Sequence, residues 1–145
     1  NKMENILVSA CLLGVSCRYD GKSKPNENVI ALKDRYNIIP VCPEIMGGLP
    51  TPRTASEIQG SQVVMGDGKN VTKEYQKGAE EVLRLCRLFG CKRAVLKEKS
   101  PSCGCGKVYD GTFSGKLIDG NGITAKLLME NGIEVFGETG IMNLD

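Results

Sequence analysis

Three short apolar segments of this chain each lead into a cysteine that lies in a loop rich in glycine or proline. They are residues 6–10 before Cys11, 38–41 before Cys42 and 93–98 before Cys103. Short apolar runs bounded by turn residues are typical of strands buried on both faces, as in a parallel sheet. Ligands of such sheets bind beyond the carboxyl ends of the strands. If the three strands are parallel neighbours, their thiols therefore meet at one edge of the sheet.

The segments between these strands predict helices and small hairpins. The predicted helices are about 26–36, with Asn26 as the cap, 72–89 and 121–131, and a last strand follows at 133–136. Glycine-containing turns at 66–68 and 110–111 predict β-hairpins over 62–72 and 107–113. This alternation predicts one α/β domain over residues 1–145, with a mainly parallel, Rossmann-like sheet covered by helices and with small β-hairpin excursions.

The composition excludes several classes of function. The net charge is +2 and no basic stripe is present, so we expect no nucleic-acid partner. No apolar run approaches the roughly 20 residues of a membrane span, and no signal peptide is apparent, so we expect a cytoplasmic protein. The chain has seven cysteines and no histidine. An odd cysteine count argues against a disulfide scaffold, and the lack of histidine excludes Cys-His zinc sites and Ser-His-Asp triads.

Three thiolates at one sheet edge could hold a particular kind of metal centre. A cubane iron-sulfur cluster usually takes four cysteines, so a cluster held by three leaves one iron open toward a substrate atom. Zinc with three thiolates and a water is the competing occupant, and inert buried cysteines are the structural alternative. Cys17 and Cys105 each lie near a candidate ligand and remain open as a fourth ligand or a spare thiol. We expect Cys86, on the apolar face of a helix, and Cys91 to be packing residues.

Polar residues beside these cysteines are candidates for catalysis and binding. Glu44, two residues after Cys42, is a candidate general acid or base, and its alternative is a solvated loop carboxylate. Ser100 and Ser102 flank Pro101 before Cys103 and could donate to a developing anion, although Ser-Pro also favours plain turns. The last candidates, for binding a substrate carbonyl or anion, are Arg53 and Lys97. For both, a surface salt bridge is the commoner role.

Five stretches form long and specific motifs that span most of the chain. They are 6–21, 41–53 (Val-Cys-Pro-Glu through Pro-Arg), 96–104 (Leu-Lys-Glu-x-Ser-Pro-Ser-Cys-Gly), 109–115 and 122–125. In these motifs the sequence resembles the DUF523 family, which includes the thiouracil desulfurases.

The resemblance implies a [4Fe-4S] cluster on Cys11, Cys42 and Cys103, and catalytic roles for Glu44 and Ser100. It further implies that the open iron binds the thione sulfur of a thiolated nucleobase such as thiouracil, and that water replaces sulfur at carbon without net redox change. The partner would be a small molecule, and the oligomeric state is left open. The alternatives are a zinc-binding or metal-sensing module on the same thiols, a thiol-redox protein using Cys103 and Cys105, and a purely structural protein.

Overall fold

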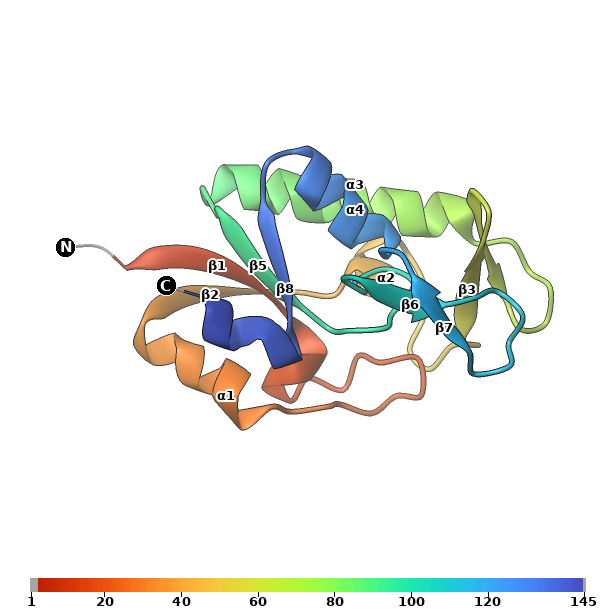
Figure 1. Cartoon of the computed structure of the whole chain (residues 1–145), viewed down its shortest axis with the longest axis horizontal. Coiled ribbons are helices and arrows are strands. Elements are labelled where there is room, and N and C mark those ends of the chain that lie inside the picture. Colours follow the sequence, from red (N-terminus) through yellow and green to blue (C-terminus); the bar gives the residue numbers. More distant parts are fainter. Residues whose placement is uncertain (1–2, 145) are drawn as a thin grey trace.

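The computed structural model describes residues 3–144 and contains a four-stranded parallel sheet with the order β2-β1-β5-β8. Its strands are β1 (Glu4–Ser9), β2 (Tyr36–Val41), β5 (Arg93–Leu96) and β8 (Glu134–Gly137). In this order β1 is paired on one side with β2 and on the other with β5. The strands that precede the three loop cysteines are therefore parallel neighbours, and the predicted fold class is confirmed (Figure 1). Residues 1–2 and 145 of the predicted domain lie outside the described residues.

Helices cover both faces of this sheet. One face carries α3 (Thr72–Leu88) and α4 (Ile123–Glu130), and the other carries α1 (Glu27–Ile30) and the 3-10 helices η1 (Ala10–Leu13), η2 (Ala31–Asp34) and η3 (Glu138–Asn143) (Figure 1). The side chains of β1 point alternately to the two faces of the sheet, so this strand contributes to the core under each layer of helices. Ile6 and Val8 belong to the core beneath α1 and η3, whereas Leu7 belongs to the core beneath α3 and α4. All three side chains are fully buried, which fixes the position of the central strand.

The helix ends follow local sequence rules. The Asn26 side chain caps α1 by accepting hydrogen bonds from the amides of Asn28 and Val29. The predicted helix over 26–36 forms as two short pieces, α1 and η2. The loop after Cys42 contains a short helix that the sequence did not predict, α2 (Pro43–Met46), which begins at a proline in its first turn.

α2 lies directly against the N-terminal half of α3. A Cβ at Gly47 would clash with the Glu74 carbonyl, and a Cβ at Gly78 would clash with the Pro43 carbonyl. Only glycines at these two positions permit so close an approach, which places the start of α2 beside α3.

Two hairpins lie beyond the sheet. The first joins β3 (Ser56–Gln59) to β4 (Gln62–Met65), and the second joins β6 (Lys107–Tyr109) to β7 (Leu117–Asp119). The predicted pairing of 62–65 with 69–72 is confirmed by an antiparallel Val64–Asn70 bridge and by backbone hydrogen bonds from Met65 to Lys69 and from Val71 to Val63. The sequence did not predict β3, with which β4 pairs on its other edge. The predicted second hairpin is present, but its return strand starts later because residues 110–116 form a wide loop.

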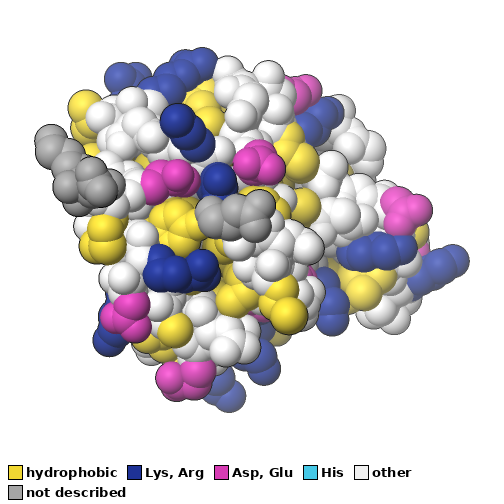
Figure 2. Space-filling view, turned by 60° about the vertical axis from the view of Figure 1, so that its left-hand side comes forward, with side chains coloured by type: hydrophobic (Ala, Val, Ile, Leu, Met, Phe, Trp, Pro, Cys, Tyr) yellow, Lys and Arg dark blue, Asp and Glu magenta, His cyan; other side chains and the backbone are white. Residues whose placement is uncertain are grey.

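The surface shows no concentration of one charge on the face seen in Figure 2, where acidic and basic side chains alternate around small apolar areas. Within residues 3–144, none of the helices has the length and apolar character of a membrane span.

Candidate active site

A cavity of about 410 Å³ lies at the carboxyl edge of the sheet. The ends of β1, β2 and β5 supply its floor, and the β3 and β6 hairpins contribute residues to its wall. Cys11, Cys42 and Cys103 all line it, so the structure brings the three predicted ligands together as expected. Each comes from the turn after its own strand, because a buried strand of this fold can expose a side chain to a ligand only where it ends.

Cys17 lines the same cavity, which the sequence left undecided. Its carbonyl oxygen lies 3.7 Å from the Cys42 thiol, which donates to it. The side-chain interaction with Cys11 raises the pKa of Cys17, and burial adds to the effect. The pKa of Cys42 is raised well above its usual range, mainly by its interaction with Cys17 and then by burial. Burial raises the pKa of Cys103 to about 12, and the nearby Glu44 charge adds to it. A metal centre here would displace protons from thiols that are otherwise neutral.

The arrangement of these thiols discriminates between occupants. Thiolates on one tetrahedral zinc ion lie about 3.8 Å apart, given Zn–S bonds of about 2.3 Å. Within the described part of the chain, no three Cys, Asp or Glu side chains form a group suited to a single ion. A cubane cluster binds each cysteine through a different iron atom, so its ligands stand farther apart. Soft thiol donors around one cavity, without histidine, therefore fit an iron-sulfur cluster.

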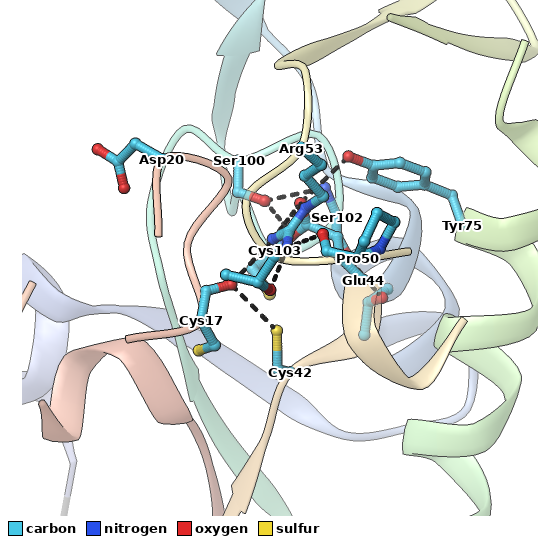
Figure 3. A network of polar contacts seen from close by, with 12 residues as sticks. Cys17, Asp20, Cys42, Glu44, Pro50, Arg53, Tyr75, Ser100, Ser102 and Cys103 are labelled. Carbon is cyan, nitrogen blue, oxygen red and sulfur yellow. Dashed lines mark hydrogen bonds and ion pairs between the residues drawn. The ribbon is translucent and has the colours of Figure 1, made fainter. Parts of the chain in front are cut away.

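Glu44 projects from α2 and is held by two side chains. Its Oε2 accepts a hydrogen bond from Arg53 Nη2 at 3.1 Å and one from the Tyr75 hydroxyl of α3 at 3.2 Å (Figure 3). The close approach of α2 to α3 makes the second contact possible. Burial, followed by the Glu44 charge, raises the pKa of Tyr75, so this phenol stays protonated and keeps donating. The other carboxylate oxygen, Oε1, accepts no hydrogen bond from residues 3–144 and is free to bind water.

Arg53 was a candidate substrate-binding residue. It lines the cavity, but its guanidinium is committed to protein groups: besides Glu44, Nη2 donates to the Cys17 carbonyl at 3.0 Å and Nη1 to the Pro50 carbonyl at 3.1 Å. The Arg53 side chain is only 3% exposed. Its clearest role in the structure is to fix Glu44 and the loop that carries Cys17.

Ser100 sits in the turn before Cys103 and lines the cavity. Its Oγ accepts hydrogen bonds from the amides of Ser102 at 3.0 Å and Cys103 at 3.1 Å. With both lone pairs engaged, the hydroxyl can only donate its proton to a further group. The structure thus makes Ser100 a fixed donor beside the thiols.

Ser102, predicted to bind substrate, does not reach the cavity. Its side chain is fully buried, and its Oγ is hydrogen-bonded to Thr124 Oγ1 of α4 at 2.8 Å. The Ser-Pro-Ser motif alternates in direction, so that one serine faces the cavity and the other the core. This expectation is corrected, because Ser102 joins the turn to α4 instead.

Lys97 lines the cavity but is already paired. Its Nζ lies 2.8 Å from Glu138 Oε2 of η3 and donates to the Glu98 carbonyl at 3.1 Å. A substrate anion would have to compete with that carboxylate.

The remaining cysteines lie away from the cavity. Cys86 donates to the Cys91 carbonyl at 3.2 Å, and both thiols are buried in the core under α3, as predicted. The Cys105 thiol donates to the Val135 carbonyl at 3.5 Å and does not line the cavity, which removes the simplest basis for a Cys103–Cys105 redox pair.

Sequence reasoning missed Tyr75 as a functional residue. It assigned Tyr75 to the apolar face of the helix, which is correct for the ring, since the residue is only 2% exposed. The signal that could have found it is chemical: a buried tyrosine needs a hydrogen-bond partner for its hydroxyl.

Fold and site together define a class of α/β protein whose carboxyl sheet edge presents cysteines, a held carboxylate and a donating serine to one cavity. The 2-thiouracil desulfurase family model matches residues 6–140. The uncharacterized protein YbbK of Bacillus subtilis strain 168 is 41% identical over 143 residues, covering 92% of this chain and 95% of YbbK. The solved structure of the [4Fe-4S]-dependent thiouracil desulfidase TudS (DUF523Vcz) is similar, with a TM-score of 0.93, 48% identity, and coverage of 97% and 95% of the two chains. The chain belongs to the 2-thiouracil desulfurase family.

Proposed function

We propose that this protein is a [4Fe-4S]-dependent desulfurase that converts a thiolated nucleobase, such as 2-thiouracil, and water into the corresponding oxo base and sulfide. The observation that carries the proposal is the meeting of Cys11, Cys42 and Cys103 with Glu44 and Ser100 at one cavity. Family membership and the similarity to TudS support the same chemistry. The reaction exchanges sulfur for oxygen at one carbon and needs no external electron donor or acceptor.

Cys11, Cys42 and Cys103 would hold the cluster. When bound, it would supply a Lewis-acidic iron without a cysteine ligand, which suits a soft thione sulfur. Cys17 would be the spare thiol. It interacts with two of the ligands, Cys11 and Cys42, but it is not one of the three that the sequence and the family resemblance imply.

Glu44 acts as the general base in this proposal. Arg53 and Tyr75 hold its Oε2, so that the free Oε1 takes a proton from the attacking water. Ser100 donates from a fixed position to the departing sulfur, because both of its acceptor sites are occupied by backbone amides. We assign the binding of the substituents on the substrate ring to the mouth of the cavity. Arg53 and Lys97, which are already paired with protein carboxylates, add positive charge there without direct contact to the substrate.

We also propose that residues 1–145 act as one desulfurase domain and that the protein works in the reducing cytoplasm with a small-molecule substrate.

The test is anaerobic reconstitution with iron and sulfide, followed by metal analysis and an assay of sulfide and uracil released from 2-thiouracil. We expect about four irons per chain and equal amounts of the two products. Bound zinc in place of iron, or a loaded protein that releases no sulfide from a panel of thiolated bases, would overturn the proposal.

A further inference from the structure

The aromatic side chains on the surface are unevenly distributed. Among residues 3–144, the exposed aromatic side chains are Tyr19, Phe89 and Phe113, at 43%, 43% and 40%. Tyr19 and Phe113 line the thiol cavity, whereas Phe89 follows the end of α3 and does not. Exposed aromatic surface at the mouth of a cavity is a common feature of ligand sites.

Phe113 is held in an unfavourable backbone conformation. Its φ is +57°, in the left-handed region that a bulky side chain rarely adopts. Such strain persists only where surrounding contacts enforce it, and it concentrates at functional sites. Because Phe113 is exposed, burial of its side chain offsets little of the free-energy cost of this backbone conformation. Other contacts must therefore hold the residue in place.

The contacts that enforce the conformation come from β3. Glu57 Oε1 accepts hydrogen bonds from the amides of Gly111 at 2.9 Å and Phe113 at 3.1 Å. Gln59 Nε2 donates to the Gly111 carbonyl at 2.8 Å. A Cβ at Gly111 would lie 2.6 Å from the Ile58 carbonyl, so the loop rests directly on the strand. The loop over 110–116 is therefore anchored, and its one exposed ring is fixed in space.

The ring itself packs beside Gly66. A Cβ at Gly66 would lie 3.7 Å from the ring, in ordinary van der Waals contact. The ring therefore lies near the end of β4, and the residue borders the cavity that holds Cys42, Cys103 and Glu44. A partly exposed ring on an anchored loop at the border of a cavity is what a stacking surface requires.

We propose that Phe113 is a specificity-determining residue, whose ring forms the platform on which the planar ring of the thiolated base stacks. The inference rests on the desulfurase function proposed above and adds to it a selection for planar, conjugated thiones. Stacking suits this task because every nucleobase has a π-face, whatever its ring substituents. Tyr19, from the loop after β1, supplies a second aromatic side chain at the same mouth.

The test compares two substrates in the reconstituted protein. One is 2-thiouracil and the other is 5,6-dihydro-2-thiouracil, which keeps the thiocarbonyl and the carbonyl but lacks the C5=C6 double bond, so that its ring is puckered and not conjugated all round. Loss of stacking in F113A should lower kcat/KM for 2-thiouracil about tenfold, mainly because KM rises. The kcat/KM for the dihydro compound should change less than about twofold. F113L should show a smaller loss of the same selectivity, and F113Y, which keeps the ring, should restore it.

F89A is the matched control, because Phe89 has a similar exposure outside the cavity, and it should keep the wild-type selectivity. The equilibrium binding of uracil, which contains no sulfur, gives a second readout: F113A should weaken it by the same factor while thermal melting confirms folding. Equal losses on both substrates, or F113L with wild-type selectivity, would refute the platform and leave the desulfurase function intact. A wild-type protein that releases no sulfide from either substrate would instead refute the proposed function, and the platform with it.

Discussion

Two groups of cysteines in this protein are largely buried and chemically different. At the cavity, Cys11, Cys17 and Cys103 are 8%, 4% and 4% exposed and Cys42 is partly buried, and beneath α3, Cys86 and Cys91 are 0% and 4% exposed. Burial raises the pKa in both groups: to about 12 at Cys103 and to about 11 at Cys91. Neither exposure nor acidity therefore separates a ligand from a packing residue.

What separates the groups is the surroundings of the sulfur atoms. The cavity thiols face a volume bordered by Glu44, Arg53 and Ser100, so a bound centre could meet a base and a donor. The Cys86 thiol instead donates to the Cys91 carbonyl among apolar side chains of α3 and β5. The difference follows from position in the fold: strand ends open to a ligand, whereas the interior of a helix–sheet contact does not.

Replacing a cavity thiol should have the largest effect. C11A, C42A and C103A should each lose most of the iron and fall in sulfide release by more than about 100-fold, because each removes one of the proposed ligands. Iron content, visible absorbance and product formation measure the loss. C86A should keep iron and activity and lower the free energy of unfolding by about 1 kcal/mol. Normal iron loading in C103A, or its loss in C86A, would erase the distinction between the two groups.

Replacing the cavity carboxylate should come next. E44Q keeps the size of the side chain but cannot accept a proton, so sulfide release should fall about 100-fold or more while iron content stays near wild type. Y75F removes one hydrogen bond to the carboxylate and should cost about tenfold. Full activity in E44Q would show that the base lies elsewhere in the cavity.

Cys17 tests the boundary between the groups, because it lies in the cavity but is not one of the three proposed ligands. C17A should keep iron within about twofold of the wild-type value, since three cysteines remain to hold a cubane. Metal analysis of C17A and C42A, prepared side by side, makes the comparison. An equal loss of iron in both variants would make Cys17 a ligand.

The pH dependence of stability provides the smallest and most specific test. The pKa of Cys91 is raised from 9.0 to about 11, mainly by burial, so the folded state binds this proton more tightly than the unfolded state. Its stabilising contribution is complete below about pH 9 and is lost as the pH rises through about 11. Relative to C91A, the wild-type apo protein should therefore lose about 1–2 kcal/mol between these values, measured by urea unfolding. Parallel curves for the two proteins would contradict the assignment of this shift to the native state.

Much of the architecture could be predicted because its signals are local. The apolar runs, the Asn26 cap and the periodicity of α3 are each encoded within a few neighbouring residues. The positions of Cys11, Cys42 and Cys103 relative to their strands follow from the same signals. The family motifs then supplied roles that the spacing of cysteines alone could not.

The errors arose where partners are distant in sequence. Ser102, expected at the cavity, is hydrogen-bonded to Thr124, 22 residues further along the chain. The pairing of Lys97 with Glu138 likewise joins residues 41 positions apart. No local pattern carries that information, since a serine or a lysine has the same propensities whatever lies opposite.

By itself, the sequence determined the four strands of the central sheet, where each thiol leaves its strand, and which chemistry the family motifs support. The tertiary structure alone decided that Tyr75 and Arg53 hold Glu44, that Ser100 and not Ser102 faces the cavity, and that Phe113 is fixed at its mouth. The physical reason is that backbone preference and apolar periodicity act over a few residues. The orientation of a polar side chain is set by whichever donor or acceptor the folded chain brings within hydrogen-bonding distance.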